Sequence, residues 1–343
     1  MAEVIGWDIG GVHTKAVWLS QGNLARARVE SQAFEIWKAD DELPSVLRSV
    51  HSSLEVGFPD AMAVTMTAEL ADVFESKRQG VLFVLHALRE AFPDTPIFLL
   101  SLDQHFEPLE AALGNPLAFA AANWLASALF IAEQESSCLL VDVGSTTTDI
   151  VPIHEGCIVA SGRTDMERLI AGELVYTGVV RTNPNTVAAR VPVRGQSCSV
   201  AAEMFALMGD VYLQLGLLAP SDYTASTPDA GPKTVLGAQR RLARLVCADV
   251  EILSPEEIQH LARYLYERQL QQVSEAMYQV SSRLPGEDSP LIAAGSGGFL
   301  AIRAGQRLGL PRASLDISSE ALSVLPCLAV AALLDKHLEN GQI

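Results

Sequence analysis

Two short stretches of this chain share a pattern of aspartate, glycine and hydroxyl residues that could bind phosphate. Residues 7–17 read WDIGGVHTKAV and residues 141–151 read VDVGSTTTDIV. A shift of 134 positions places Asp8 on Asp142, Gly10 on Gly144, Thr14 on Thr148 and Gly22 on Gly156. Glycines and hydroxyl residues in a turn between two strands direct backbone N–H and side-chain O–H donors at one anion. The repeat therefore predicts two phosphate-binding loops.

Each loop supplies its own candidate phosphate ligands, because glycine lets an anion approach the backbone closely and hydroxyls donate hydrogen bonds. The predicted phosphate-binding residues are Gly10, Gly11, His13 and Thr14 in the first loop and Gly144, Ser145, Thr146, Thr147 and Thr148 in the second. For His13 a structural role competes with a ligand role. A third glycine-rich turn (Gly295, Ser296, Gly297 and Gly298) follows a strand pattern and precedes a helix pattern, which suits a phosphate or a nucleotide edge.

Charged residues in the two loops predict a metal site and the catalytic groups. Asp8 and Asp142 end apolar strand patterns, where an unpaired carboxylate would be costly. Both are predicted Mg²⁺ ligands, directly or through water, with phosphate oxygens completing the shell. Lys15 adds positive charge to the first loop only, because its counterpart is Asp149. Asp8, Lys15 and Asp142 are therefore predicted catalytic residues, and the first loop is expected to be the more cationic.

Composition limits the partners of the chain. The 343 residues carry a net charge of −17, which argues against nucleic acid and anionic membrane surfaces. Residues 111–132 lack charges, but polar interruptions such as Asn115 and Asn123 favour a buried helix over a membrane span. The N-terminus has no signal-peptide pattern, and the five cysteines have irregular spacing. We therefore expect a cytoplasmic protein with reduced thiols that acts on small molecules; homo-oligomerisation stays open.

The elements that must position these residues alternate between strand and helix. Apolar runs predict strands over 3–8, 15–20, 61–65, 96–100, 138–142 and 290–294. Helical spacing covers 44–55, 78–92, 118–133, 201–215, 236–246, a long helix from Ser254, and 320–337. Residues 181–200 and 220–233 lack such spacing and are expected to be irregular. The alternation predicts an α/β fold with mixed sheets. The internal repeat predicts two lobes, 1–134 and 135–343, with the last helix able to pack back on the first.

The three glycine-rich motifs, in this order, resemble the actin-like ATPase and sugar kinase superfamily. There they are the two phosphate motifs and the adenosine motif, and the DVGSTTTDI form is most similar to the hydantoinase A and oxoprolinase branch. The resemblance implies two ribonuclease-H-like lobes with mixed sheets flanked by helices around a central cleft. It also implies that ATP or ADP could bind. Val12-His13 departs from the residues usual in the first phosphate motif of the kinases, which puts ATP use in doubt.

A narrower resemblance rests on VTMTAELAD (64–72), AAANW (120–124) and residues 177–216. These stretches are similar to short single-chain members of that branch in methanofuran biosynthesis, which is linked to one-carbon transfer on tetrahydromethanopterin. The resemblance implies a transferase that joins an aminomethyl-furan-methyl diphosphate to the phenol of γ-glutamyltyramine. An ether forms and diphosphate leaves, and ATP is not required. On this interpretation the loops, Lys15 and Mg²⁺ stabilise the leaving diphosphate.

The phenol needs a group that takes or orients its proton, and Glu69 is the first candidate. The alternative for Glu69 is an ordinary acid at a helix start. Predicted substrate-binding residues are Thr65, Thr67, Asn123, Arg181, Asn183 and Arg190. An arginine could clamp the glutamyl carboxylate, although ordinary surface arginines fit the pattern equally well.

Two other functions fit the same motifs. An ATP-dependent kinase or amide-ring hydrolase of this superfamily would need bound ATP and turnover to ADP, whereas the transferase needs neither. A nucleotide-switch protein without enzyme activity would need a partner or polymer surface, and residues 220–233 are too short to argue for one. Whether the reaction needs ATP and forms ADP therefore separates the kinase or hydrolase from the transferase.

Overall fold

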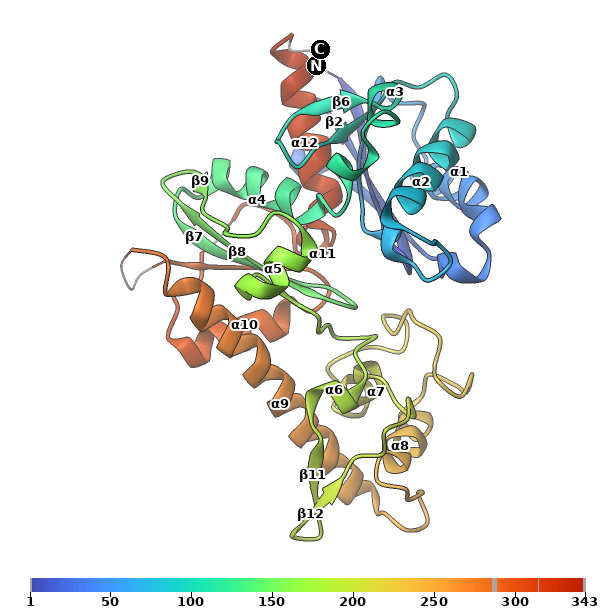
Figure 1. The fold of residues 1–343 in the computed structure, drawn as a ribbon, viewed down its shortest axis with the longest axis vertical. Helices are drawn as coiled ribbons and strands as arrows, with labels where there is room; N and C mark the ends of the chain where they lie inside the picture. Colours follow the sequence, from blue (N-terminus) through green and yellow to red (C-terminus); the bar gives the residue numbers. More distant parts are fainter. Residues whose placement is uncertain (1, 286–288, 314, 342–343) are drawn as a thin grey trace. The chain divides into compact units, whose positions relative to one another are not determined.

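The computed structural model describes residues 2–285, 289–313 and 315–341. The chain forms two compact units (Figure 1). The first comprises Met1–Leu140, Val151–Glu167 and Ser314–Ile343, and the second Val141–Ile150 and Arg168–Ala313. The division into lobes at residue 134 stays a prediction, and each compact unit is described by itself.

The first sheet has six strands in the order β3-β2-β1-β4-β5-β6. The strands are β1 (Glu3–Ile9), β2 (His13–Ser20), β3 (Arg28–Ala33), β4 (Ala61–Met66), β5 (Ile97–Leu100) and β6 (Phe106–Pro108). The β1, β4 and β5 strands run parallel, whereas the β1–β2, β2–β3 and β5–β6 pairs are antiparallel. This is the mixed sheet that the sequence predicts, with antiparallel hairpin strands first and helix-linked parallel strands after them.

Alternation along β1 separates the two faces of this sheet. Ile5, Trp7 and Ile9 belong to a core that includes buried residues of α1 (Leu43–Ser53) and α2 (Lys77–Ala91). Gly6 points to the opposite face, since successive side chains of a strand alternate. There α12 (Leu325–Glu339) packs on β1, β2 and β4 (Figure 1), and a side chain at Gly6 would overlap the Cys327 carbonyl. A glycine in β1 is therefore needed for the close approach of α12.

Shorter elements complete the first unit. They are α3 (Leu109–Ala112), α4 (Asn123–Gln134), α11 (Ser319–Ser323) and the 3-10 helices η1 (Leu24–Arg26), η2 (Ile36–Lys38), η3 (Asp40–Glu42), η4 (Ala68–Leu70) and η5 (Pro116–Phe119). The α4 helix packs on α12. No helix within the described ranges combines the length and the apolarity that a membrane span needs. All five cysteines are free thiols, as expected, and Cys138 and Cys327 are buried.

The second sheet follows the order β10-β8-β7-β13, with β9 paired to β8. Its strands are β7 (Cys138–Val143), β8 (Thr148–His154), β9 (Cys157–Ile158), β10 (Leu174–Val175) and β13 (Leu291–Ala294). A separate two-stranded ribbon consists of β11 (Arg190–Val193) and β12 (Gln196–Ser199). The segment at 181–200 therefore holds the short strands that its composition predicts, but it also contains one helical turn, Pro184–Val187, which was not expected.

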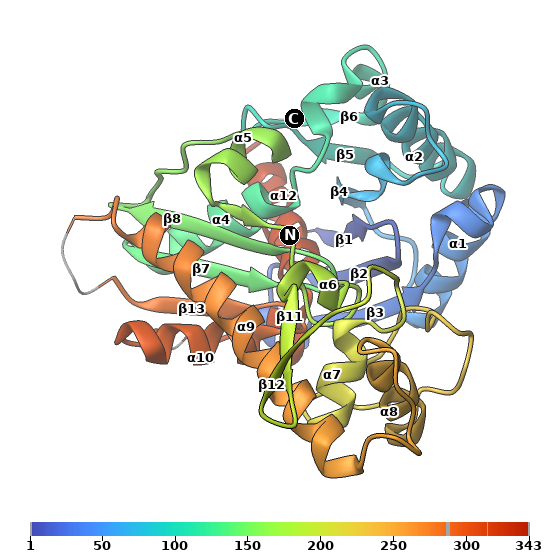
Figure 2. The same cartoon turned by 60° about the horizontal axis from the view of Figure 1, so that its bottom comes forward.

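The longest helix of the second unit is α9 (Pro255–Ser281), and several shorter helices pack on it (Figure 2). The Ser254 hydroxyl accepts from the Glu257 N–H and Pro255 opens the first turn, which confirms the helix start expected from the sequence. The neighbours are α5 (Asp165–Ala171), α6 (Pro184–Val187), α7 (Met208–Gln214), α8 (Val235–Arg244) and α10 (Gly298–Leu308). The α6, α7, α8 and α10 helices pack on α9, and Gln279 of α9 donates to the Ala171 carbonyl at the end of α5.

Three predicted helices were placed too broadly. The helix expected over 201–215 exists only as α7, because the Asp210 carboxylate caps Leu207 N and starts the helix there. The helix expected over 118–133 begins at Asn123, after the positive φ of Ala121. The helix expected over 320–337 breaks at Val324 into α11 and α12, because Pro326 cannot continue the hydrogen bonds of the preceding turn.

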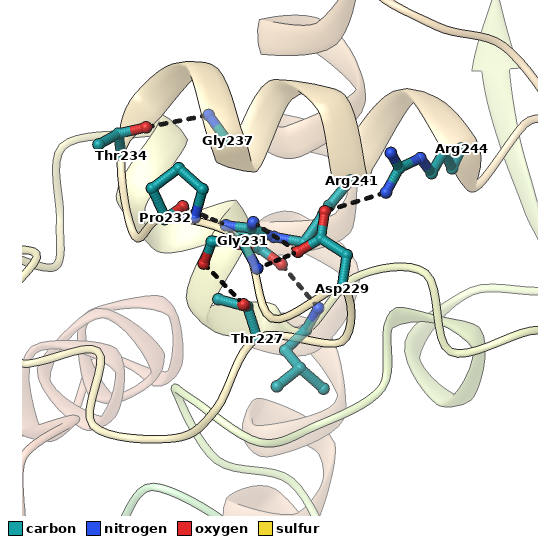
Figure 3. Close-up of polar contacts among 10 residues, drawn as sticks. Thr227, Asp229, Gly231, Pro232, Thr234, Gly237, Arg241 and Arg244 are labelled. Atoms are coloured by element: carbon teal, nitrogen blue, oxygen red, sulfur yellow. Dashed lines mark hydrogen bonds and ion pairs between the residues drawn. The ribbon is translucent and has the colours of Figure 1, made fainter.

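Residues 220–233 form the predicted loop, and a buried arginine fixes it in place (Figure 3). Arg241 of α8 is fully buried and donates to Asp210 (2.9 Å), to Asp229 (3.0 Å) and to the Pro232 carbonyl (3.3 Å). Arg244 donates to the other oxygen of Asp229. Burial raises the pKa of Asp210 in spite of the bond from Arg241. The loop is thus pinned to α7 and α8 by charge-assisted hydrogen bonds.

Candidate functional site

The two predicted phosphate loops have the same backbone construction. In the first, Gly10 N–H donates to the His13 carbonyl at 2.8 Å, and in the second Gly144 N–H donates to the Thr147 carbonyl at 2.8 Å. The turns that follow also correspond, since Gln21-Gly22 and Glu155-Gly156 all have positive φ, between 51° and 71°. Equivalent bonds at equivalent positions show that the sequence repeat is a repeat of structure.

The first loop stands beside three residues that the strand register brings together. Asp8 pairs with Lys15 of β2 on one side and with Thr65 of β4 on the other. Paired residues of neighbouring strands place their side chains on the same face of a sheet. Asp8 is 7% exposed, and the buried Thr65 hydroxyl donates to the Trp7 carbonyl. A carboxylate, an ammonium and a hydroxyl therefore share one face next to the loop.

The loop itself is held by the backbone around it. The Gly11 carbonyl accepts from Ile36 N–H, and the Val12 carbonyl accepts from Phe34 N–H. Gly10 lies against Thr67, whose hydroxyl oxygen would be 3.4 Å from a methyl group at this glycine. Thr67 is therefore brought to the first loop. His13 begins β2 with its carbonyl in the hairpin bond, and Thr14 is fully buried, so hydroxyl donation by Thr14 to a ligand requires movement.

Glu69 carries a buried carboxyl group and lies in the first turn of a 3-10 helix. It sits in η4 with 1% of its surface exposed, and its Oε2 has no hydrogen-bond partner within the described ranges. The η4 backbone packs directly on Gly80 of α2. Burial raises the pKa of Glu69 to about 7, while Lys77, which is ion-paired with Asp165 at 2.5 Å, opposes the rise. Such a carboxyl group can exchange a proton near neutral pH.

The second loop lies against the segment 177–181. Val179 N–H donates to the Gly144 carbonyl, and Val180 N–H and Arg181 N–H donate to the Ser145 carbonyl at 3.0 and 2.8 Å. A side chain at Gly178 would overlap the loop backbone. These contacts bring the Arg181 backbone to the second loop and leave Ser145, Thr146 and Thr147 on a fixed turn. The predicted ligand Thr148 begins β8, and its buried hydroxyl donates to the Thr177 carbonyl, so donation to a ligand requires movement, as for Thr14.

The late glycine-rich turn joins the second loop at Asp142. Gly297 N–H donates to the Val143 carbonyl at 2.8 Å. Gly295 has a φ of 80°, and a side chain there would overlap the Asp142 carboxylate. Ser296 follows Gly295, and α10 begins at Gly298, whose N–H donates to the Gly295 carbonyl. Asp142, the second loop and the late turn therefore form one group of residues, and anion binding by this group stays a prediction.

An arginine that the sequence did not reveal accompanies the second loop. Arg168 of α5 is 1% exposed, and its Nη1 donates to Asp149 at 2.6 Å while Nη2 donates to the Glu173 carbonyl. The second hairpin thus carries an ion pair at the position where the first carries Lys15. No residue spacing in the sequence indicates Arg168, because its contact with Asp149 depends on how α5 packs. The acidic Asp149 in the second loop could have indicated only that a basic partner was needed.

Three other predicted substrate residues have local contacts. Asn183 caps α6 by accepting from Asn185 N–H at 3.0 Å. Arg190 is exposed and donates to Ser197 and Ser199 across its own β-ribbon. Asn123 is the partly exposed first residue of α4. These contacts give Asn183 and Arg190 structural roles in their own segments, and a substrate role for the three residues stays a prediction.

The residues present fit a magnesium ion that arrives with substrate phosphates. Across the described ranges, no group of three or more His, Cys, Asp or Glu side chains could hold a metal alone. Asp8 and Asp142 each offer one carboxylate next to a glycine-rich loop. Mg²⁺ is commonly held by one or two carboxylates together with water and phosphate oxygens. Mg²⁺ binding here stays a prediction.

Comparison with known proteins shows the family. The hydantoinase/oxoprolinase family profile matches residues 60–337, and the chain belongs to this family. A curated protein of Methanocaldococcus jannaschii, named (4-{4-[2-(gamma-L-glutamylamino)ethyl]phenoxymethyl}furan-2-yl)methanamine synthase, is 33% identical over 338 residues, 98% of this chain and 99% of that protein. A protein of the same name from Methanococcus vannielii is 34% identical over 149 residues, 43% of this chain and 67% of that protein.

A solved structure shows the fold. Nucleotide-free acetone carboxylase aligns with a TM-score of 0.57 and 10% identity, over 95% of this chain and 70% of that one. The predicted α/β class with mixed sheets, of the actin-like ATPase type, is confirmed. The predicted resemblance to the hydantoinase/oxoprolinase branch and its methanofuran members is confirmed as well. The chain is therefore an enzyme of this family.

Proposed function

We propose that the chain makes the ether bond of a methanofuran precursor. It transfers an aminomethyl-furan-methyl group from its diphosphate to the phenol oxygen of γ-glutamyltyramine. The bond between CH₂ and the diphosphate oxygen breaks, a bond between CH₂ and the phenol oxygen forms, and the phenol proton leaves. The observation that carries this proposal is the 33% identity, over 98% of the chain, to a synthase named for this ether product.

Stabilisation of the leaving diphosphate is the main task of the protein groups. The furan oxygen stabilises positive charge on the neighbouring CH₂, so cleavage can run ahead of bond formation. Preorganised N–H and O–H donors of the two loops, with the ammonium of Lys15, then act on the oxygens that gain charge. A magnesium ion held by Asp8 or by Asp142 would supply further positive charge. The shared hairpin construction of the two loops supports this assignment.

Glu69 is proposed as the acceptor of the phenol proton. A pKa of about 7 leaves the carboxyl group partly ionised at neutral pH, and burial makes the carboxylate a stronger base than an exposed one. Thr65 and Thr67, next to Asp8 and the first loop, are proposed to line the substrate site. Arg181 is proposed to meet the carboxylate of the glutamyl group.

An assay without nucleotide tests this proposal. The purified chain is incubated with the furan diphosphate, γ-glutamyltyramine and Mg²⁺, and ether and diphosphate are measured by mass spectrometry and a coupled assay. The proposal predicts one diphosphate per ether, with no gain from ATP. A strict need for ATP with formation of ADP would instead support a kinase or ring hydrolase, which the family match alone also allows.

The same proposal fixes the remaining partners. Both substrates are small molecules, and the net charge of −17 disfavours nucleic acid and anionic membranes as partners. We place the reaction in the cytoplasm, and ATP or ADP is not needed for it. Association of two or more copies is compatible with this chemistry but is not required by it.

A further inference from the structure

The amide of Gln269 is fully buried in the middle of α9, the long helix of the second unit. Its Nε2 donates to Thr177 Oγ1 at 2.8 Å and to the Gly178 carbonyl at 2.9 Å. Its Oε1 accepts from the Tyr212 hydroxyl at 2.6 Å. Gln269 thus ties α9 and α7 to residues 177 and 178, and both polar atoms of its amide are hydrogen-bonded, as buried polar atoms require.

Those two residues lie directly on the second phosphate loop. The Thr177 carbonyl accepts from the Thr148 hydroxyl at 2.7 Å. Gly178 approaches the loop so closely that a side chain would overlap the Thr146 N–H and the Gly144 carbonyl. The backbone bonds from 179–181 to the loop follow immediately. A displacement of Thr177 and Gly178 would therefore move the loop backbone and its hydroxyl residues.

The first loop has no hydrogen bonds of this kind from a helix glutamine within the described ranges, although its hairpin has the same glycine N–H bond. Thr14 corresponds to Thr148 and is equally buried, but its hydroxyl has no hydrogen-bond partner within the described ranges. Phe34 and Ile36 provide the N–H groups that meet the carbonyls of the first loop. The first hairpin therefore forms although the hydroxyl of its threonine is not hydrogen-bonded in the described part of the chain. The hydrogen bonds from Gln269 through Thr177 and Gly178 are thus not needed to form such a hairpin, and they serve the second loop alone.

We propose that Gln269 is a positioning residue for the second phosphate loop. It acts through Thr177 and Gly178, and it holds the N–H groups of the second loop and the hydroxyl groups of Ser145, Thr146 and Thr147 in the orientation that receives phosphate oxygens. The inference rests on the proposed function, in which this loop binds the diphosphate. It goes further by assigning the orientation of the loop to a side chain on a different helix, remote in sequence by about 120 positions.

Three substitutions test the proposal. Gln269→Met keeps a side chain of similar length but removes the amide donors. Tyr212→Phe removes only the hydroxyl that fixes the Gln269 amide. Gln259→Met is the matched control, because Gln259 also lies on α9 and accepts from Gln214 of α7 at 2.6 Å. The control therefore removes a glutamine bond between the same two helices.

Two measurements separate positioning from general stability. Calorimetric titration with inorganic diphosphate and Mg²⁺ reports ligand affinity, and hydrogen exchange of the peptide spanning 142–149 reports loop order without a ligand. We expect Gln269→Met to weaken diphosphate binding about ten- to hundredfold, the effect of losing about one hydrogen bond to a charged group. Loop exchange should become faster. Gln259→Met should leave both readouts at wild-type values, and Tyr212→Phe should weaken binding by about threefold or more.

The outcomes distinguish the two proposals. Wild-type affinity and wild-type loop exchange in Gln269→Met would overturn the role of Gln269 while leaving the proposed function intact. Absence of diphosphate binding by the wild type, with faster loop exchange only in Gln269→Met, would keep the positioning role and overturn the proposed function. If Gln269→Met does not fold, Tyr212→Phe decides, and unchanged affinity and exchange in that variant would overturn the inference.

Discussion

At the scale of the residue, the proposed ether formation needs a group that accepts a phenol proton near neutral pH. Glu69 is the group proposed for this role, because it is almost fully buried and burial raises its pKa to about 7. The sequence predicted a role for Glu69 only from the surrounding motif, VTMTAELAD, and an ordinary acid at a helix start was the alternative. The structure places Glu69 at a helix start and also buries it, and this burial depends on the packing of α2 against η4.

Replacement of Glu69 by glutamine should remove the proton acceptor with little change of shape. We expect kcat to fall by about 10²–10⁴-fold, the usual contribution of general acid–base catalysis. For the wild type, kcat should rise with pH through about 7 as the carboxyl group ionises. The measurement is a pH–rate profile of both proteins from pH 5.5 to 9. Full activity of Glu69→Gln would remove Glu69 from the mechanism.

The same carboxyl group should make stability depend on pH. A folded pKa raised from 4.5 to about 7 means that the folded state binds the proton more tightly than the unfolded chain. This stability is therefore present below pH 4.5 and is lost as the pH rises through 7, by about 3 kcal/mol in total. Urea denaturation at pH 5 and 8 should show this loss in the wild type but not in Glu69→Gln. An exposed control, Glu90→Gln, should behave like the wild type.

Gly295 offers a prediction about the anion site of the second unit. Its φ of 80° and its contact with the Asp142 carboxylate leave no room for a side chain. We expect Gly295→Ala to displace Asp142 and to lower kcat/KM for the furan diphosphate by roughly a hundredfold. Gly309 also has a positive φ, of 70°, but no atom lies within 4 Å of a methyl group there, so Gly309→Ala is the matched control. Equal kcat/KM values in the two variants would show that the turn does not position Asp142.

At the scale of the element, the predictable parts are those whose cause is local. The start of α9 follows from Ser254, Pro255 and Glu257, and both hairpins follow from turn residues that accept positive φ. The start of α7 could not be predicted, because it depends on Asp210, which also receives Arg241 from α8. Packing between elements decides which residues pair with buried charges, and the hydrophobic periodicity of the sequence does not predict these pairs.

Removal of Arg241 should therefore cost more than any surface arginine. Arg241→Met leaves Asp210 buried and without its guanidinium partner, and it releases the loop held through Asp229. Loss of one partner of a buried ion pair typically destabilises a protein by about 3–5 kcal/mol. Denaturant unfolding measures the effect. Arg244→Met, which removes only the partly exposed bond to Asp229, should cost about 1 kcal/mol or less; equal losses would contradict the account.

At the scale of the whole molecule, the repeat was visible in the sequence because it fixes backbone geometry. Glycine at positions 10 and 144, and at 22 and 156, is retained where the two hairpins bend in the same way. The differences between the copies were only partly visible. Asp149 in place of Lys15 could be read directly, whereas Arg168 and the hydrogen bonds of Gln269 required the structure. The candidate site is thus predictable in its loops and not in the side chains that hold them.

The central claim is that a fold of the actin-like ATPase type here serves a diphosphate leaving group without using ATP. Single-turnover reaction of the nucleotide-free chain with the furan diphosphate and γ-glutamyltyramine, in the presence of Mg²⁺, tests it most directly. The account predicts ether and diphosphate in equal amounts and no change in rate when ATP is added. Ether or phosphorylated product that forms only with ATP, together with ADP, would contradict it.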